Sequence, residues 1–400
     1  MSHRREPSVK ETLDASITET NDGERSLNNY ILKDEIGHGA YGTVSLAIDK
    51  ETNTKYAIKE FSKSRLRKKD KANYFRRPPR GGMRGARGRG RGGAIFSNQS
   101  LNDPLYLIRS EIAVLKKLNH KNVVTLFEVL DDPENDSLYM VFEMCEKGVL
   151  MDVSINKKTT PFSDEKCRRY FREMVLGFEY LHENDIVHRD IKPDNLLLSS
   201  NDVLKIVDFG VSEIFTKGND LMKKSAGSPA FMPPELCAAD HGQISGKAAD
   251  IWSMGVTLYC LAFGCLPFVK DNIIDLYDSI NKDDLEIPNN NVDPKLVDLL
   301  YKILEKSPEK RITMPEIRVN PWLTNNGNEP LISTEENCSE MVTEITEDDL
   351  SSAIKTISVG GVFAVIGAVN KFKRLSRSSH SASESDLAKL KAIGDSENSV

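Results

Sequence analysis

The 400-residue chain lacks any apolar run long enough to cross a bilayer. Its most apolar late run, 357–369, has 13 residues and three glycines, whereas a spanning helix needs about 20 apolar residues. The N-terminus is polar and has no apolar core of the secretory signal type. We therefore expect a soluble cytoplasmic protein, with the nucleus also open to it, and no membrane partner.

Cysteine is scarce as well. The chain has six cysteines, no two of them with the C-x-x-C spacing found in zinc sites and redox motifs. This favours reduced thiols inside the cell over a disulfide framework or a zinc site.

The charge of the chain is unevenly distributed. Hydrophobic residues make up 39% and charged residues 28%, which are ordinary values for a soluble globular protein. The net charge is −6, yet residues 61–93 carry 13 Lys and Arg against one acidic residue, so the remainder carries −18. One strongly basic segment is thus attached to an acidic body.

Within that basic segment, residues 76–93 form an Arg/Pro/Gly-rich insert. It has seven arginines, seven glycines and no acidic residue, a composition that cannot form a packed core. Three interpretations are open: a flexible solvated insertion, a docking surface for an acidic partner, or an RNA-binding segment. The third is the least favoured, because no aromatic residues interleave with the Gly-Arg repeats, so we do not expect a nucleic-acid partner.

The ends of the chain differ in pattern from its middle. Residues 1–29 are polar and weakly patterned, and residues 377–400 are rich in serine, so both are predicted to be disordered tails. From Tyr30 onward the pattern becomes strand-like. The length allows two or three domains and a large core.

A glycine-rich stretch lies near the start of the patterned region. It fits G-x-G-x-x-G-x-V and comprises Ile36, Gly37, His38, Gly39, Ala40, Tyr41, Gly42, Thr43 and Val44. Glycine lets a backbone turn lie against phosphates without a Cβ in the way. Strand candidates at 45–48 and 56–60 follow instead of a helix, which argues against a Rossmann unit.

A lysine and a glutamate are predicted to pair beside this loop. Lys59 ends an apolar strand, and Glu111 falls within the apolar stripe of a helix predicted over 105–118. A glutamate in an apolar stripe is costly unless it is paired, and Lys59 is the obvious partner. Such an ion pair would aim the lysine at the phosphates of a nucleotide. The alternatives are an exposed strand-end lysine and a boundary glutamate that reaches solvent.

The octet 188–195, His-Arg-Asp-Ile-Lys-Pro-Asp-Asn, supplies the groups that phosphoryl transfer needs. Asp190 can orient an attacking hydroxyl and accept its proton, Lys192 can neutralise charge on the moving phosphoryl group, and Asn195 can ligate Mg²⁺. Thirteen residues after Asn195, the sequence Asp208-Phe209-Gly210 offers a second metal-ligating carboxylate in a turn after a strand-like run. Alone, the octet could be a polar loop, but the second carboxylate weakens that interpretation.

Taken together, these motifs resemble the eukaryotic protein kinases over Tyr30 to Trp322, in the order and spacing of that family. The resemblance implies an α+β, bilobal fold over 30–323, with a small β-rich lobe on a larger helical lobe and ATP in the cleft. By the same resemblance, the glycine loop covers the phosphates and Lys59 pairs with Glu111. Asp190 is then the catalytic base, Lys192 contacts the γ-phosphate, and Asn195 and Asp208 hold Mg²⁺.

The resemblance also assigns the residues around these motifs. The backbone of Glu143 and Cys145 would bind adenine, with Phe142 guarding the back of the pocket. The lysine at position 192 points to Ser/Thr rather than Tyr specificity.

The resemblance further implies an activation segment from Asp208 to Glu235. By it, Glu235 should pair with Arg311, Asp250 should brace the catalytic loop, and the hydroxyl of Ser228 should contact Asp190. Arg189 could pair with a phosphate on this segment, in which Ser225 also lies. The segment holds no phosphothreonine of the expected kind, so we do not expect activation by phosphorylation there.

A narrower resemblance is to the calcium/calmodulin-dependent protein kinase kinases. The insert and the runs 128–133, 138–143, 227–232 and 321–331 carry it. It implies that the substrates are Thr or Ser in the activation loops of downstream kinases, of the AMP-activated or calmodulin-kinase type. Ser228 and Pro-Pro-Glu at 233–235 instead resemble the liver-kinase group, which is activated by adaptor proteins. A pseudokinase scaffold is the third alternative, disfavoured because every catalytic position is present.

The C-terminal region has a basic amphipathic pattern. Acidic residues at 340–350 are followed by apolar residues spaced as on one helix face, and then by cations. These residues are Val362, Val365, Ile366, Val369, Lys371, Lys373, Arg374 and Arg377. Such a helix is typical of calmodulin targets. The resemblance to the calcium/calmodulin-dependent protein kinase kinases implies an overlapping autoinhibitory and calmodulin-binding segment here, so we expect 324–376 to be regulatory. The alternative is a helix packed permanently on the large lobe.

Overall fold

The computed structural model describes residues 9–19, 23–39, 42–64, 106–132, 135–154, 157–215, 219–222, 227–238, 243–288, 292–340 and 349. All of them belong to the first of two compact units, 1–353. Several predictions lie outside the described residues: the insert at 76–93, the basic helix beyond 362, the tail at 377–400, Ser225, and Ala40 with Tyr41 of the glycine loop.

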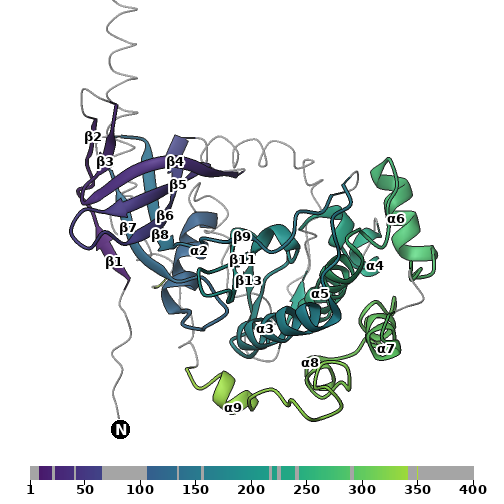
Figure 1. The fold of residues 1–400 in the computed structure, drawn as a ribbon. Coiled ribbons are helices and arrows are strands. Elements are labelled where there is room, and N and C mark those ends of the chain that lie inside the picture. Colours follow the sequence, from purple (N-terminus) through teal and green to yellow (C-terminus); the bar gives the residue numbers. More distant parts are fainter. Residues whose placement is uncertain are drawn as a thin grey trace, which may run out of the picture. The chain divides into compact units, whose positions relative to one another are not determined.

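The small lobe is built on a sheet whose eight described strands run in the order β1-β7-β8-β6-β5-β4-β3-β2 (Figure 1). They are β1 (Lys10–Thr12), β2 (Ile17–Glu19), β3 (Arg25–Leu27), β4 (Tyr30–Gly39), β5 (Gly42–Asp49), β6 (Lys55–Ser62), β7 (Leu126–Asp131) and β8 (Ser137–Glu143). Neighbours pair antiparallel except β1 with β7. Helix α2 (Tyr106–Lys117) adds Ile112 and Val114 to the buried core.

The prediction that 1–29 is a disordered tail is wrong for residues 9–19 and 23–29, which contribute β1, β2 and β3. Each strand has only three residues, too few to show an alternating pattern. Contacts with distant parts of the sheet hold them. Leu27 is fully buried with Ile58 and Val141, and Glu128 accepts hydrogen bonds from the hydroxyls of Thr12 and Tyr30.

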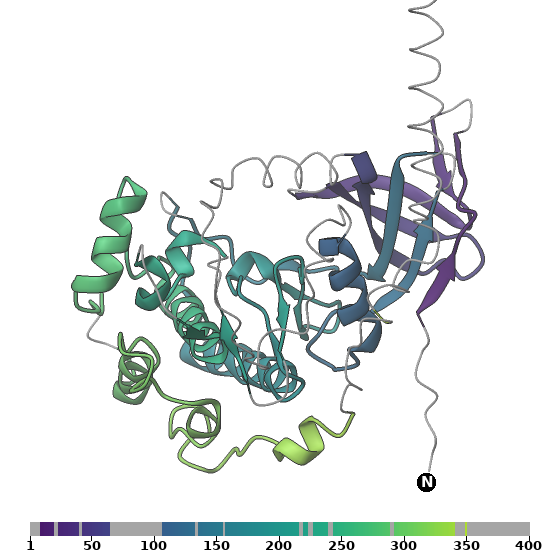
Figure 2. The same cartoon turned by 180° about the vertical axis from the view of Figure 1, so that it is seen from behind.

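The large lobe is helical. Its helices are α3 (Asp164–Glu183), α4 (Pro234–Cys237), α5 (Gly246–Phe263), α6 (Ile273–Lys282), α7 (Pro294–Ile303), α8 (Met314–Arg318) and α9 (Thr334–Asn337) (Figures 1 and 2). Helix α5 is apolar on nearly every side, as expected for a central helix. It starts where the side chain of Ser245 caps the amide of Ala248. It ends at Gly264, whose φ is +69° and where a Cβ would lie 2.0 Å from the carbonyl oxygen of Thr159.

Short strands position the loops between the helices. One small sheet joins β9 (Gly148–Val149), β11 (Leu196–Leu198) and β12 (Leu204–Ile206). The strand β10 (Ile186–Val187) pairs with β13 (Glu213–Ile214), and β14 (Leu221–Met222) pairs with β15 (Ile244–Ser245). Each of the two pairs ties a stretch that follows Asp208 to the body of the large lobe. The predicted α+β bilobal fold is thus confirmed.

The chain continues along the large lobe beyond the predicted domain end at 323. The Arg172 guanidinium donates to the carbonyls of Leu323, Glu329 and Pro330 at 2.6–3.1 Å. The buried Glu179 of α3 accepts from Asn337 and Thr334, both at 2.8 Å. The stretch between residues 323 and 337 therefore contacts α3 at several points. No helix in the described part of the chain is long and apolar enough to span a membrane.

Candidate active site

Three charged side chains meet at the base of the small lobe. The Lys59 ammonium of β6 lies 3.1 Å from Glu111 Oε1 of α2 and 3.5 Å from Asp208 Oδ1. Burial disfavours the charged amine, but the two carboxylates together raise the pKa of Lys59 above its ordinary value. The lysine therefore stays charged, and the predicted pair with Glu111 is present in the structure.

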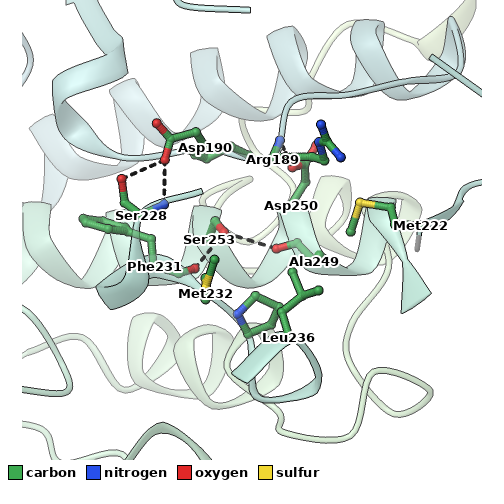
Figure 3. Close-up of a pocket in the computed structure, with 12 residues that line it drawn as sticks. Arg189, Asp190, Met222, Ser228, Phe231, Met232, Leu236, Ala249, Asp250 and Ser253 are labelled. Carbon is green, nitrogen blue, oxygen red and sulfur yellow. Dashed lines mark hydrogen bonds between the residues drawn. The ribbon is translucent and has the colours of Figure 1, made fainter. Parts of the chain in front are cut away.

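A second group forms around Asp190. Its Oδ1 accepts from the amide and the hydroxyl of Ser228, both at 2.8 Å (Figure 3). Its Oδ2 accepts from Asn195 Nδ2 at 3.0 Å and lies 3.0 Å from the Lys192 ammonium, which also donates to the Ser228 hydroxyl at 2.8 Å. Burial alone would raise the pKa of Asp190, but Ser228 and Lys192 outweigh it and hold the pKa below the ordinary value. Asp190 is thus an ionised carboxylate held in a fixed orientation.

The loop that carries Asp190 is braced from α5. Asp250, which is buried, accepts from the amides of His188 and Arg189 and lies against His182 Nε2, all at 2.9 Å. Arg189 has a φ of +71°, a strained conformation for a non-glycine residue. Such a conformation persists only where neighbouring contacts hold it. Asp250 supplies two of these contacts, which agrees with its predicted role of bracing the catalytic loop.

The turn containing Asp208 is joined to this loop through the backbone and one ring. The amide of Val207 donates to the carbonyl of Asn195 at 3.1 Å, and His188 Nε2 lies 3.0 Å from the carbonyl of Val207. The ring of Phe209, which is buried, meets the ring of His188 edge-on at 5.2 Å. Asp208 itself is half exposed with a φ of +63°. The structure therefore brings Asn195 and Asp208 to neighbouring positions with the second carboxylate open to a ligand.

The glycine loop is the hairpin between β4 and β5. Ile36, Gly37 and His38 lie on β4, and Thr43 and Val44 lie on β5. Gly42 and Gly37 differ in whether the surrounding structure would exclude a side chain. At Gly42 a Cβ would lie 1.6 Å from the carbonyl of Glu60, so the sheet itself demands glycine there. At Gly37 a Cβ would meet only Val44, at 3.7 Å, so nothing in the described protein forbids a side chain.

The segment from Glu143 to Gly148, referred to here as the hinge, joins β8 to β9 of the large lobe. The Glu143 carboxylate accepts from Lys205 Nζ and from the amide of Thr125, both at 2.8 Å. The amide of Glu143 donates to the carbonyl of Thr125 at 3.1 Å, and the carbonyl of Cys145 accepts from Gly148 at 3.0 Å. These contacts fix the backbone at the end of β8 and at Cys145.

The activation segment returns to the catalytic loop through several contacts. At Gly227 φ is +110° and a Cβ would lie 2.3 Å from the carbonyl of Arg189, so glycine is needed for this close approach. Arg311 makes the predicted pair with Glu235, through two hydrogen bonds of 2.7 and 2.9 Å. Beside Asp190, Ser253 of α5 donates to the carbonyl of Phe231 at 2.8 Å (Figure 3). The segment is thereby fixed under the catalytic carboxylate.

Sequence reasoning missed the partner of Arg189. The sequence offered a phosphate on the segment only as one partner that Arg189 could take. In the structure its guanidinium pairs with Glu213 of β13 and donates to the carbonyl of Val211. No motif marks Glu213. The sequence shows only that Glu213 follows Asp208 by five residues. That spacing does not determine how β10 pairs with β13, and this pairing is what places Glu213 beside Arg189.

Comparisons with known proteins agree with this geometry. The family model described as the protein kinase domain matches residues 96–323. The chain is 46% identical over 395 residues to the calcium/calmodulin-dependent protein kinase kinase cmkC of Emericella nidulans, covering 93% of this chain and 74% of that protein. It is 40% identical over 350 residues to the calcium/calmodulin-dependent protein kinase kinase of Caenorhabditis elegans, covering 87% of this chain and 62% of that protein. To the serine/threonine-protein kinase ppk34 of Schizosaccharomyces pombe it is 42% identical over 308 residues, covering 77% and 86%.

Proposed function

Since the chain belongs to the protein kinase family, and within it to the serine/threonine kinases of the calcium/calmodulin-dependent protein kinase kinase type, we propose that it phosphorylates Thr or Ser in the activation segments of downstream kinases. The observation that carries the catalytic part is the placement of Asp190, which is ionised, oriented from both oxygens and next to the cation of Lys192. Phosphoryl transfer depends mainly on such positioning and on electrostatic stabilisation.

Each residue of this group has a defined task in the proposal. Asp190 accepts the proton of the substrate hydroxyl, while Ser228 and Asn195 hold its carboxylate in place. Lys192 stabilises charge on the transferred phosphoryl group. Lys59, held by Glu111, contacts the α- and β-phosphates of ATP.

The neighbouring oxygen donors suit Mg²⁺. The described residues contain no cluster of three or more His, Cys, Asp or Glu side chains that could hold a metal alone. Magnesium is commonly bound by one or two protein oxygens together with substrate phosphates. The side-chain Nδ2 of Asn195 donates to Asp190, which leaves the side-chain oxygen Oδ1 of Asn195 as a ligand. The half-exposed Asp208 supplies a carboxylate. Bound there, the ion would neutralise phosphate charge.

The adenine of ATP is proposed to lie against the hinge. Glu143 and Cys145 would contact it through backbone groups, and Phe142 of β8 would close the back of the pocket. Support comes from the fixed hinge backbone described above. The glycine loop from Ile36 to Val44 would cover the phosphates, where Gly37 leaves room for close approach.

The test of this proposal is MgATP-dependent labelling of a peptide taken from a kinase activation segment. Asp190→Asn should lower kcat by about 10²- to 10⁴-fold, the usual contribution of a positioned general base. Lys59→Met should abolish transfer. Thermal unfolding of both variants controls for loss of the fold. Normal transfer by either folded variant would overturn the assigned roles.

Calcium regulation is a second part of the proposal. The names of two relatives include calcium/calmodulin, and the pattern at 362–377 is that of a basic amphipathic helix. A peptide of residues 345–378, titrated with calmodulin with and without Ca²⁺, should bind only with the ion. The full-length protein should gain activity under the same condition. Absence of calcium-dependent binding would favour activation by adaptor proteins instead.

The insert at 76–93 is proposed to dock protein substrates. Its arginines carry a charge opposite to that of an acidic partner surface. Deleting these residues should impair phosphorylation of intact kinases and leave phosphorylation of a short peptide unchanged. Equal loss for both substrates would contradict a docking role. A cytoplasmic location is part of the same proposal and can be checked by imaging the tagged protein.

A further inference from the structure

The pair between Lys59 and Glu111 exists only while α2 is held in one position. Glu111 lies less than two turns before Lys117, the last residue of α2. A helix moves as a stiff element, so a shift at this end displaces the carboxylate that aims Lys59. The contacts that fix the C-terminal end of α2 therefore affect the position of Lys59 and, through it, catalysis.

The N-terminal strand holds one side of this end. The ammonium of Lys116 lies 2.7 Å from Glu11 Oε1 of β1, and both side chains are less than one quarter exposed. Strand β1 is itself fixed, since it pairs with β7 and its Lys10 reaches the buried Glu128 at 3.0 Å. The anchor for Lys116 is thus part of the sheet.

The C-terminal flank, which is the part of the chain beyond residue 323, supplies the second contact at this end of α2. The ammonium of Lys117 lies 2.6 Å from Asp349 Oδ2, with exposed side-chain fractions of 18% and 32%. Just beyond the helix, Asn119 Nδ2 donates to Glu340, and His120 Nε2 lies 3.0 Å from Asn337 Oδ1.

Asn337 in turn connects this flank to the large lobe. Its amide donates to the carbonyl of Leu176 at 2.9 Å and to Glu179 at 2.8 Å, both on α3. The ring of His120 also stacks on Tyr180 of α3 at 4.7 Å. The contacts at the end of α2 therefore join the small lobe, the large lobe and the C-terminal flank.

From these contacts we propose that Lys116 and Lys117 are positioning residues for the Lys59–Glu111 pair. Two adjacent cations in the last turn of α2 each take a carboxylate from a segment outside 30–323. Together the two ion pairs fix the helix so that Glu111 reaches Lys59. Cations also suit the C-terminal end of a helix, which carries partial negative charge. The inference rests on the proposed kinase function.

Charge exchange in the full-length protein tests the inference. Lys116→Glu and Lys117→Asp should each raise the KM for ATP and lower kcat. We expect a combined effect of about five- to twentyfold, which lies in the lower part of the range of typical couplings between sites. The exchanged pairs, Lys116→Glu with Glu11→Lys and Lys117→Asp with Asp349→Lys, should recover to within about twofold, since the opposite charges again face each other.

A matched control is available on α7. Lys302 and Asp298 form an ion pair of 2.7 Å whose side chains are more than half exposed. Lys302→Glu should leave both kinetic constants unchanged. An effect of the Lys116 or Lys117 reversal no larger than that of Lys302→Glu would overturn the inference, as would failure of both exchanged pairs to recover.

Binding of a fluorescent ATP analogue separates the two proposals. If the wild-type protein binds the analogue but transfers no phosphate, the proposed function fails, and the analogue affinities of the variants still report on the position of Lys59. If the wild-type protein transfers phosphate and the reversals change neither KM nor analogue affinity, only the positioning role fails. Thermal unfolding measured in parallel should show less than a few degrees of change for the exchanged pairs.

Discussion

Arg189 of the catalytic loop is paired with Glu213 of the activation segment. Both side chains are largely shielded, with exposed fractions of 14% and 22%. The cation beside Asp190 therefore already has an anion from the same chain. Glu213 thus supplies the negative charge for Arg189 without a phosphate.

The first prediction is that activity does not require phosphorylation of the activation segment. Protein treated with phosphatase should keep its kcat on a peptide, because Glu213 supplies the counter-charge for Arg189. Glu213→Gln should lower kcat about tenfold, since a buried guanidinium is then left without its anion. Steady-state kinetics after mass-spectrometric confirmation of the phosphorylation state is the measurement. A phosphatase-treated enzyme that is inactive would contradict the argument.

The second prediction concerns Ser228. Ser228→Ala removes the hydroxyl donor to Asp190 and the acceptor for Lys192. Because the hydroxyl stabilises the ionised carboxylate, the pKa of Asp190 should rise in the variant. The acidic limb of kcat/KM should then move to higher pH, while the wild-type enzyme loses activity only at lower pH. Ser228→Thr, which keeps a hydroxyl, is the control, and identical profiles for all three proteins would count against this role.

The third prediction concerns the buried pair of Glu235 and Arg311. The Arg311 side chain is fully buried, also donates to the carbonyl of Ala248 at 2.9 Å, and stacks on Trp252 at 5.1 Å. Glu235→Ala leaves this guanidinium without its counter-charge, which typically costs about 3–5 kcal/mol. Urea unfolding should show this loss.

An exposed pair supplies the comparison for Arg311. Lys282 and Asp278 lie 2.8 Å apart on α6, and both side chains are more than 60% exposed. Lys282→Ala should change the free energy of unfolding by about 0.5 kcal/mol or less. Equal losses in the two variants would show that burial does not set the strength of the Glu235 pair.

The fourth prediction concerns the thiol at the hinge. Burial, and secondarily the nearby Glu143, raises the pKa of Cys145 to about 12. At pH 7.5 the thiol stays protonated, and only the thiolate reacts with alkylating agents. Native Cys145 should therefore react with iodoacetamide on the order of 10³ times more slowly than in urea-unfolded protein. Peptide mass spectrometry at timed intervals gives the rate, and rapid native labelling would contradict the burial of this side chain.

Part of the site followed from the sequence because its motifs fix both residue type and spacing. The pairs of Lys59 with Glu111, of Asp190 with Ser228 and of Glu235 with Arg311 were all expected, and each is present. The first pair was expected because a glutamate in an apolar stripe needs a partner. The other two were expected from the resemblance to the protein kinases.

Other contacts depended on strand register and on long-range pairing. Glu213 reaches Arg189 because Val187 pairs with Glu213 across β10 and β13, a register of two-residue strands that no local pattern specifies. The strands before Tyr30 escaped prediction for a similar reason. Glu128, far along the chain, supplies the acceptor that holds Thr12 and Tyr30. Tertiary contacts of this kind override local propensity.

The early strands carry a practical consequence for recombinant work. An expression fragment trimmed at Tyr30 would strip β1 and β3 from their neighbours and leave β7 and β4 as open edges. It would also deprive the Glu128 carboxylate of Thr12 and Lys10. Open strand edges can pair with other molecules and cause aggregation. Poor solubility of such a fragment would therefore result from the truncation and not from an intrinsic property of the enzyme. A fragment intended for crystallisation should start ahead of Lys10.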